Sequence, residues 1–571
     1  MTRPITARAK ILGGATGELK KMRRTMREVF GLERMRLGQA EVIRSVISGH
    51  DTLAVMPTGA GKSLCYQLPA LHLPGTTVIV SPLISLMKDQ VDKLSEAGVE
   101  AAQVNSALTE AERREELERI ERGASELVFT TPERFTDPAF LEILRTKELD
   151  FVVIDEAHCI SEWGHDFRPS YLALGAAVRT LGSPPVLALT ATATPEVVED
   201  IRKQLGLRGL RVFNTGIYRE NLYYEVLRVT NEREKREQLA RLMRETEGSG
   251  IVYCATVKAV EALAELFRGS EFETRTYHGK LSASERREHQ DLFMAGRLKA
   301  VFATNAFGMG IDKPDIRFVV NYQMPGSLEA YYQESGRAGR DGEEARCTLL
   351  YQLDDRRTQL FFLGGRHPKA EDLWAVCDAL RAAGADVKPV TLAPVQEAAP
   401  NVAKTKVRVA LSLLKEAGVV REARGVRFKL ARPDVTREEV ERAAEAAAGR
   451  GGADREKLER VMLYGQSAEC RWKLLHEYFG EPFGRERCGH CDNCLHPLEE
   501  QLGLTRDETG APAKEAGPAP KRKVVEFNEG DAVRLPKYGR GRVVSLEDDK
   551  VSVKFPDGET RTFKREFVKK G

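Results

Sequence analysis

The sequence of 571 residues lacks any apolar run close to the roughly 20 residues that a membrane-spanning helix needs, so we expect no contact with a membrane. Its first 30 residues lack the apolar core of a secretory signal; they are basic, which is typical of a solvated segment. The net charge is only +3, so a surface for an anionic polymer would have to be local. With 42% hydrophobic and 30% charged residues, the composition is that of a globular protein, and the length allows three or four domains.

Cysteine is scarce, and five of the nine cysteines are scattered, which suits a reducing compartment better than a disulfide framework. The other four are Cys470, Cys488, Cys491 and Cys494, at the close spacing that tetrahedral zinc requires. With four protein ligands no position stays open, so the zinc would be structural. His490 lies among them as an alternative ligand, and four free core cysteines are the remaining interpretation.

Two stretches alternate short strands rich in Val, Ile and Leu with helical periodicity, over residues 29–214 and 215–355. Such alternation indicates parallel sheets covered by helices on both faces. We therefore expect an α/β fold with two tandem parallel-sheet domains, preceded by a basic segment at residues 1–28.

The pattern changes after residue 355, where two helical stretches are followed by a pair of short strands joined at Arg424-Gly425. This order suggests a winged helix–turn–helix. Lys404, Arg408 and Lys415 would share one face of its second helix, either as phosphate contacts or as an ordinary solvated face. The expected parts are a winged-helix-like domain at 356–436, a zinc-binding module at 437–497, a flexible linker at 498–523 and a small β-barrel at 524–571.

A phosphate-binding loop is indicated by MPTGAGKS at residues 56–63, which follows a strand and precedes a helical run. Backbone N–H groups would cradle phosphates there, with Lys62 at the terminal phosphates and Ser63 on magnesium. Met56 stands where the strict pattern has glycine, so an ordinary glycine turn is the alternative. The residues expected to cradle the nucleotide are Thr58, Gly59 and Gly61.

Two carboxylates, Asp155 and Glu156, follow the apolar run DFVVI. Asp155 would hold magnesium, and Glu156 would orient or deprotonate the attacking water. The transition state also needs a cationic group, which Arg337 and Arg340 of QESGRAGR can supply. These arginines belong to the second parallel-sheet domain, so the site would assemble when the two domains close, and hydrolysis would become a conformational cycle.

These motifs stand in a recognisable order: RLGQ, MPTGAGKS, SPLISLMKDQ, TPERF, DEAHCISEWGHDFRPSY, LTATAT, YHGKL, ATNAFGMGIDKPDIR and YYQESGRAGRDG. The chain resembles the RecQ family of superfamily 2 DNA helicases over about residues 29–355 and again over 457–495. The resemblance implies two RecA-like domains with ATP, Mg²⁺ and structural Zn²⁺. It implies an ATP-dependent helicase that moves 3′ to 5′ on single-stranded DNA and unwinds duplex or branched DNA in recombination, repair or replication. The expected location is the cytoplasm, at the nucleoid.

The resemblance also assigns roles to matching positions. Gln39 should read the adenine edge, and Thr190 and Thr192 should link hydrolysis to domain movement. Family members usually have a tyrosine where Leu32 stands, so adenine stacking is expected to be weaker, with Arg36 left to cover the base. The residues that should meet the nucleotide from the second domain are Gly310, Asp312 and Gln333 beside the two arginines.

In RecQ-like helicases the loop after the DEAH box senses single-stranded DNA and couples it to hydrolysis. Trp163, Phe167 and Arg168 suit this role, because aromatic rings stack on any base and a guanidinium pairs with phosphate. His165 would take part in passing DNA occupancy of this loop to the hydrolytic site. An aromatic core patch is the alternative interpretation.

Two features depart from the usual family plan. The winged-helix-like stretch precedes the zinc cysteines rather than following them, and no candidate for the small helical domain that often ends these helicases is found. Residues 530–570 resemble the Tudor-like module of UvrD/PcrA-type helicases, with Leu535 where histidine is common. That resemblance implies a protein partner such as RNA polymerase or a repair factor, with nucleic acid and a plain structural cap as alternatives.

Two other functions are consistent with parts of the pattern. A DEAH box is shared with RNA helicases, although the WGHDFRP loop and the zinc cysteines favour the DNA enzyme. An ATP-driven DNA translocase or clamp with little strand separation is the other alternative, because the accessory domains are rearranged.

Overall fold

The structure is a computed structural model, and it divides into two compact units, Met1–Pro497 and Leu498–Gly571. Among its described helices, none has the length and hydropathy of a membrane span. The residues that it describes are 15–161, 168–308, 311, 313–366, 368–423, 427–497, 528–535, 539–547, 550–556, 558–564 and 569–570.

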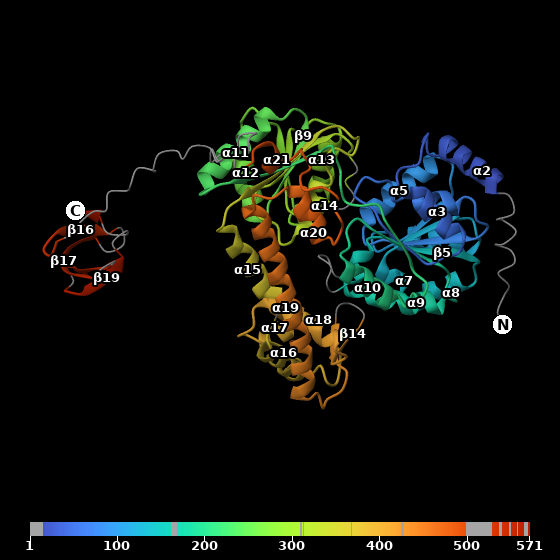
Figure 1. Ribbon diagram of the computed structural model, residues 1–571. Helices are drawn as coiled ribbons and strands as arrows, with labels where there is room; N and C mark the ends of the chain where they lie inside the picture. Colours follow the sequence, from blue (N-terminus) through green and yellow to red (C-terminus); the bar gives the residue numbers. More distant parts are fainter. Residues whose placement is uncertain are drawn as a thin grey trace. The chain divides into compact units, whose positions relative to one another are not determined.

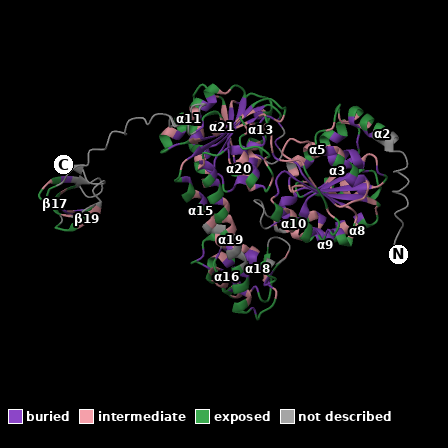
Figure 2. Ribbon diagram, in the orientation of Figure 1, coloured by how far each residue is buried: buried purple, intermediate pink, exposed green. Residues whose placement is uncertain are grey.

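Seven parallel strands form the first sheet, in the order β3-β4-β2-β5-β6-β1-β7. Figure 1 shows this sheet around the label β5. Its central strands are mostly apolar and almost entirely buried because both faces are covered: Leu53 and Val55 belong to one buried cluster and Ala54 to another (Figure 2). The strands are β1 Thr52–Val55, β2 Thr76–Val80, β3 Ala101–Val104, β4 Leu127–Thr130, β5 Leu149–Ile154, β6 Val186–Thr190 and β7 Arg211–Asn214. The helices are α3 Gln39–Ile47, α4 Leu64–Ala70, α5 Ile84–Glu96, α6 Glu110–Glu121, α7 Pro132–Phe135, α8 Pro138–Arg145, η2 Ala157–Ile160, η3 Pro169–Ala173, α9 Leu174–Thr180 and α10 Pro195–Leu205.

The basic N-terminal segment contains a helix, α2 Ala15–Glu28. Met22 and Met26 are four residues apart and therefore lie on one face, where they are buried in a cluster with Ile43 of α3 and Leu64 of α4. The described part of this segment is thus packed on the first sheet domain and is more than a solvated tail.

The second sheet has six parallel strands in the order β10-β11-β9-β12-β13-β8. Together the two sheets confirm the predicted α/β fold with two RecA-like domains. The strands are β8 Leu222–Arg228, β9 Ser249–Tyr253, β10 Thr274–Tyr277, β11 Ala300–Ala303, β12 Ile316–Asn321 and β13 Ala345–Tyr351. The helices are α11 Glu232–Glu245, α12 Val257–Leu266, α13 Ala283–Met294 and α14 Leu328–Ser335.

The predicted helices and strand pair follow the second sheet. A buried cluster joins them, and the two strands β14 and β15 are antiparallel; the predicted turn at Arg424-Gly425 lies outside the described residues. DNA binding by this domain stays a prediction. The elements are α15 Asp355–Arg366, α16 Ala370–Ala382, α17 Leu392–Ala398, α18 Lys404–Glu416, β14 Val420–Ala423 and β15 Arg427–Leu430.

One long helix, α19 Arg437–Gln466, links this domain to the second sheet. Val440 near its start is buried in the cluster of α16 and α18, whereas Val461 and Tyr464 near its end are buried in the cluster of the second sheet. The helical domain of α15 to α18 and the zinc-binding module therefore share a helix, and the winged-helix interpretation of that domain stays a prediction. The module continues with α20 Arg471–Tyr478 and α21 Asp492–Leu495.

The C-terminal unit is a five-stranded antiparallel sheet in the order β19-β18-β17-β16-β20. Its small core consists of Val533, Val543, Val551, Val553 and Phe555. A small all-β unit was predicted here, and its resemblance to a Tudor module stays a prediction. The strands are β16 Ala532–Leu535, β17 Gly539–Glu547, β18 Lys550–Lys554, β19 Thr560–Lys564 and β20 Lys569–Lys570.

Candidate nucleotide site and zinc centre

One cavity of about 600 Å³ brings together the predicted nucleotide residues of both sheet domains. Gly310 and Asp312 lie outside the described residues, so their predicted contacts stay predictions. The first domain contributes Arg36, Gln39, Thr58, Gly59, Gly61, Lys62, Ser63, Asp155 and Glu156, and the second contributes Gln333, Arg337 and Arg340.

The phosphate-binding loop runs from the end of β1 to the start of α4. Gly59 and Gly61 have φ angles of 85° and 76°, in the left-handed region that favours glycine. A Cβ at Gly61 would also lie 2.6 Å from Nε2 of Gln39, so the loop has no room for a side chain there. Lys62 donates a hydrogen bond from Nζ to the Met56 carbonyl at 3.2 Å. Burial lowers the pKa of Lys62, although Glu156 and Asp155 oppose the shift.

The acid pair follows β5 and faces this lysine. Ser81 donates a hydrogen bond to Oδ2 of Asp155 at 3.2 Å, which orients the carboxylate. Burial, reinforced by the neighbouring Glu156, raises the pKa of Asp155 to about 6. The half-buried carboxylates of Asp155 and Glu156 and the Ser63 hydroxyl line the same cavity, and such oxygens are the hard donors that Mg²⁺ prefers, so the residues present fit this ion.

Glu156 has an unusual backbone, with φ 48° and ψ 48°. For a residue other than glycine the left-handed region is strained, and such strain persists only where the surroundings enforce it. The conformation turns the chain sharply from β5 into η2. Asp155 and Glu156 are therefore followed directly by a tight turn that contains His158.

A buried chain of polar contacts connects the acid pair to β6. Nδ1 of His158 lies 3.3 Å from Oε2 of Glu156 and 3.0 Å from Oγ1 of Thr190. Thr190 in turn donates to the Thr192 carbonyl at 2.9 Å, so Thr190 takes part through its side chain and Thr192 through its backbone. The sequence argument assigned no role to His158, although it is the fourth residue of the DEAH motif.

The loop after the DEAH box is described only from Arg168 onward, because Trp163, His165 and Phe167 lie outside the described residues. The Arg168 guanidinium reaches the carbonyl of Pro82 at 3.4 Å. Tyr171 is fully buried, and its hydroxyl donates to the Asp155 carbonyl at 3.0 Å. The end of the loop is thus attached to the backbone of the acid pair, through a tyrosine for which the sequence argument proposed no role.

The two arginines of the second domain are held by contacts with neighbouring loops. Arg337 is buried and donates to the Gly308 carbonyl. A Cβ at Gly59 would lie 3.2 Å from Cγ of Arg340, so Arg340 packs directly on the phosphate-binding loop. Arg219, which the sequence argument missed, donates to the carbonyls of Gly336 and Ala338 at 2.9 Å each and fixes the turn between them.

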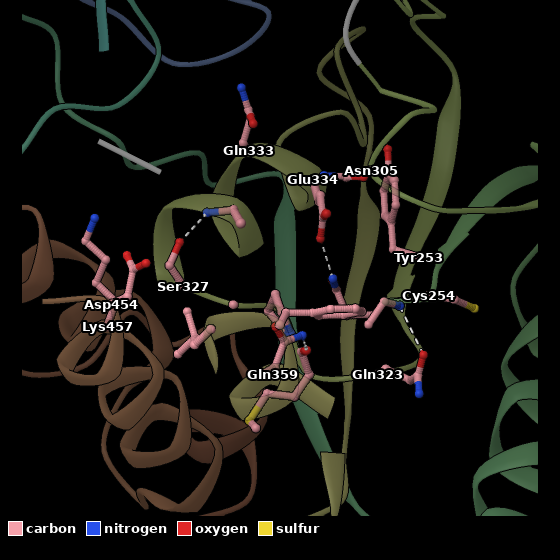
Figure 3. A pocket seen from close by; sticks show the side chains of 18 of the residues that line it. Tyr253, Cys254, Asn305, Gln323, Ser327, Gln333, Glu334, Gln359, Asp454 and Lys457 are labelled. Atoms are coloured by element: carbon pink, nitrogen blue, oxygen red, sulfur yellow. Dashed lines mark hydrogen bonds between the residues drawn. The ribbon is translucent and has the colours of Figure 1, made fainter. Parts of the chain in front are cut away.

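A second cavity of about 340 Å³ lies at the carboxyl ends of the second sheet, next to Arg337 (Figure 3). Asn321 of β12 donates to Oε2 of Glu334 at 2.6 Å, and burial raises the pKa of Glu334 to about 7. Figure 3 shows Lys457 of α19 and Gln359 of α15 among the side chains that line this cavity. Helices α15 and α19 therefore both border the cavity beside α14.

That junction is reinforced by buried contacts. Lys235 of α11 donates to both carboxylate oxygens of Asp355, at 3.1 and 2.9 Å, at the start of α15. Lys457 lies 3.8 Å from Glu329 of α14, and the rings of Tyr331 and Tyr464 pack with centroids 5.3 Å apart.

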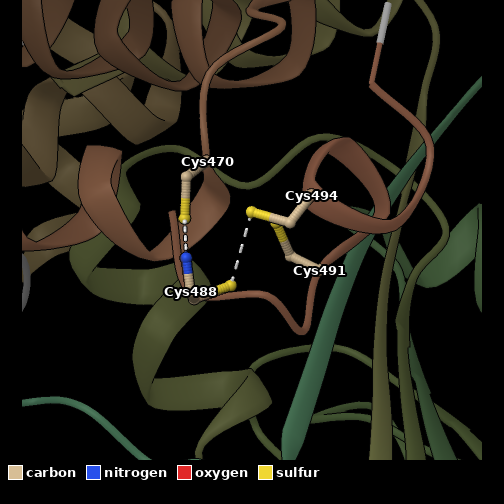
Figure 4. A group of neighbouring side chains, drawn as sticks. All are labelled: Cys470, Cys488, Cys491 and Cys494. Atoms are coloured by element: carbon tan, nitrogen blue, oxygen red, sulfur yellow. Dashed lines mark hydrogen bonds between the residues drawn. The ribbon is translucent and has the colours of Figure 1, made fainter. Parts of the chain in front are cut away.

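The four clustered cysteines converge, as their spacing predicted (Figure 4). Their sulfur atoms all lie within 4.8 Å of one another, and Sγ of Cys488 is 3.7 Å from Sγ of Cys494. Tetrahedral zinc with Zn–S bonds of about 2.3 Å places neighbouring sulfurs about 3.8 Å apart, so the site fits the ion. His490 packs its ring against Tyr223 and is not in the cluster.

The zinc module is attached to the edge strand β8 of the second sheet. Arg471, which follows the first cysteine, makes a two-pronged ion pair with Asp492 at 2.8 and 3.0 Å. Asp492 also accepts a hydrogen bond from the Val226 amide at 2.8 Å. Trp472 is fully buried and contacts Tyr224 with ring centroids 4.9 Å apart.

Comparisons with known proteins agree with these sites. Residues 36–201 match the family model for DEAD/DEAH box helicases, 234–342 the helicase conserved C-terminal domain, and 435–495 the RecQ zinc-binding domain. The probable ATP-dependent DNA helicase RecS of Bacillus subtilis (strain 168) is 43% identical over 60% of this chain and 69% of its own length. The chain belongs to the RecQ family.

Other RecQ relatives are similar over the same part of the chain. The ATP-dependent DNA helicase RecQ of Bacillus subtilis (strain 168) is 47% identical over 58% of this chain and 56% of its own length. The RecQ helicase of Pasteurella multocida (strain Pm70) is 43% identical over 57% of this chain and 51% of its own length. The chain thus spans between about half and two thirds of the length of these relatives.

In this RecQ-family chain, the segment predicted to recognise adenine is hydrogen-bonded to the phosphate-binding loop. Gln39 donates from Nε2 to the carbonyls of Ala60 and Gly61, at 3.0 and 2.9 Å, and the Arg36 guanidinium donates to the Gly59 carbonyl. Leu32, at the position where tyrosine is usual, lines the same cavity with 41% of its surface exposed.

Proposed function

We propose that the chain is an ATP-dependent DNA helicase that moves 3′ to 5′ along one strand and unwinds duplex or branched DNA. The observation that carries the proposal is the single cavity in which the phosphate-binding loop, the acid pair and the arginines of the second domain meet. A motor needs this arrangement, because hydrolysis must depend on how the two domains face each other.

In the proposed reaction the loop amides and Lys62 bind the phosphates of ATP. Ser63 and Asp155 hold Mg²⁺, which neutralises the developing charge on the phosphates. Glu156 orients and deprotonates the attacking water.

The second domain completes the proposed site. Arg337 and Arg340, with Gln333, stabilise the charge of the transition state. Gly310 and Asp312 complete the nucleotide contacts from the same side. Arg219 acts indirectly, because it holds the turn that presents the arginines.

Single-stranded DNA is the proposed activator. Trp163 and Phe167 stack on bases, Arg168 pairs with phosphate, and His165 relays occupancy of the loop. Two described contacts support this route: Arg168 reaches Pro82, and Tyr171 holds the backbone of Asp155. His158 then links Glu156 to Thr190, which ends a strand of the same sheet.

The winged-helix-like domain is proposed to contact duplex DNA ahead of the motor. Lys404, Arg408 and Lys415 of α18 are all exposed, as the helical spacing predicted. Duplex phosphates are the ligand that such a cationic helix face suits.

The test is strand displacement with ATP on a duplex that carries a 3′ or a 5′ single-stranded tail, with phosphate release followed in the same tubes. Lys62→Ala removes the phosphate contact, and Arg114→Ala, an exposed change on α6, is the matched control. Displacement from the 3′ tail alone, lost with Lys62→Ala and kept with Arg114→Ala, supports the helicase. DNA-stimulated hydrolysis without displacement from either tail contradicts it and indicates a clamp.

A further inference from the structure

The C-terminal sheet pairs cation with cation across its strands. In register, Arg542 of β17 lies opposite Lys554 of β18, and Arg534 of β16 lies between Arg540 and Lys569. Lys550 differs, because it lies between Lys564 of β19 and the acidic Glu547 of β17. The other three cross-strand pairs combine two positive residues, where like charges directly opposite each other destabilise a sheet.

Arg540, Arg542 and Lys554 share one face of the sheet. Side chains two residues apart in a strand point the same way, so Arg540 and Arg542 lie on one face, away from Val543 in the core. Arg540, Arg542 and Lys554 are exposed, and within the described part of this unit none of the three has an ion pair with a carboxylate. The repulsion is therefore not relieved by acidic neighbours among the described residues, and an anionic partner would relieve it.

The described residues of this face favour phosphate over a protein partner or unpaired bases. Among the described residues of this unit, Val544 is the one large apolar side chain that is exposed, whereas the centre of a protein interface usually has aromatic anchors. Unpaired bases need exposed rings for stacking, but of the rings that the structure describes here Phe555 is buried and Phe563 is half-buried in the core. Rows of cations about 4.8 Å apart, the spacing of neighbouring strands, suit a phosphate backbone.

We propose that this face, centred on Arg540, Arg542 and Lys554, binds the phosphate backbone of duplex DNA. The face would be a second DNA-binding site of the chain, and binding there would not require ATP. It goes beyond the proposed unwinding activity and does not depend on it.

The test measures binding of the full chain to a blunt fluorescent duplex, without nucleotide, over a range of salt concentrations. The variant Arg540→Glu/Arg542→Glu/Lys554→Glu reverses the charge at the three central positions of this face. The matched control, Arg233→Glu/Arg241→Glu/Arg268→Glu, changes the net charge equally at exposed positions of the second sheet domain. We expect affinity to fall at least about tenfold, and the slope of log K against log salt to decrease by about 2 to 3, because each lost phosphate contact removes about 0.9.

A single change separates loss of binding from loss of folding. Arg542→Glu places a carboxylate opposite Lys554, so it should keep or raise the melting temperature of the C-terminal unit while it weakens duplex binding. Equal affinity and equal slope in the wild-type chain and the triple variant would overturn the proposal and leave a protein partner for this unit. An equal loss in the matched control would overturn it too, because the effect would then be one of net charge. ATP hydrolysis on single-stranded DNA should be unchanged in every variant.

Discussion

Nδ1 of His158 lies 3.0 Å from Oγ1 of Thr190, so a buried hydrogen bond joins the DEAH turn to the end of β6. The same imidazole nitrogen is 3.3 Å from the Glu156 carboxylate. A change at Thr190 can therefore reach Glu156, the carboxylate proposed to activate water, through the single side chain of His158.

Thr190→Val removes this hydroxyl at nearly constant volume. We expect the stimulation of ATP hydrolysis by single-stranded DNA to fall about tenfold, the effect of roughly 1.4 kcal/mol, with little change in the KM for ATP. Thr180→Val, at an exposed hydroxyl of α9, should have no effect. Steady-state phosphate release, measured with and without DNA, tests this. Full stimulation in Thr190→Val would contradict a coupling role for the contact between His158 and Thr190.

Leu32→Tyr should restore an aromatic surface for adenine. Leu32 lines the cavity, whereas Leu37 is 79% exposed and does not, so Leu37→Tyr is the matched control. A stacked ring contributes about 0.5–1.5 kcal/mol, which predicts about two- to tenfold tighter binding of a non-hydrolysable ATP analogue. Calorimetric titration measures this. Equal affinity in the wild-type chain and Leu32→Tyr would show that Arg36 alone supports the base.

Asp492→Ala should destabilise the zinc module. It leaves the buried guanidinium of Arg471 without its two-pronged partner and removes the acceptor of the Val226 amide. Breaking one side of a buried ion pair costs roughly 3–5 kcal/mol, whereas adding Arg471→Met should recover much of the loss. Denaturant unfolding, with bound zinc measured in parallel, checks this. A loss below about 1 kcal/mol would mean that water already reaches the pair.

Glu334→Gln should change how stability depends on pH. Burial raises the pKa of Glu334 to about 7, so the folded chain keeps this proton while the unfolded chain releases it near pH 4.5. The wild-type chain therefore loses stability as pH rises from about 4.5 to about 7, and the loss is constant above that range. The variant, which cannot ionise, should be more stable above pH 7 by at most about 3 kcal/mol, with the difference vanishing towards pH 4.5. Melting curves from pH 4.5 to 8.5 test this, and parallel curves would contradict it.

Two glycines of α19 should respond in opposite directions to alanine. At Gly452 an added Cβ meets nothing within 4 Å, so Gly452→Ala should stabilise the helix by about 0.5–1 kcal/mol. At Gly465 the added Cβ would lie 2.3 Å from the ring of Tyr351, so Gly465→Ala should be destabilising. Thermal unfolding compares them directly. The same sign for both would show that α19 does not pack on Tyr351 as described.

The nucleotide and zinc sites were predictable because short motifs encode them. The phosphate-binding loop, the acid pair and the cysteine knuckle each depend on neighbours a few residues apart, and order along the chain identified the family. Contacts between distant segments left no such signal: nothing in the local pattern of Arg219 indicates that it fixes the turn at Gly336. Gln39 was expected to read adenine, and its bonds to the phosphate-binding loop could not be foreseen from spacing.

The helical architecture shows the same limit. Thr436 caps α19 through a capping box with Glu439, so neighbouring residues set the start of the helix. The pattern did not reveal that α19 serves two hydrophobic cores, because its apolar residues satisfy helical periodicity whichever domain they face.

The continuity of α19 has a mechanical consequence. Its 30 residues form one arm, held at one end by Tyr331 of α14 and at the other by the core of α16 and α18. Over a length of about 45 Å, a tilt of about 5° displaces the far end by about 4 Å, close to the rise of about 3.4 Å per base pair. In the helicase proposed here, a small rotation of α19 beside α14 would therefore be magnified to about the length of one base pair.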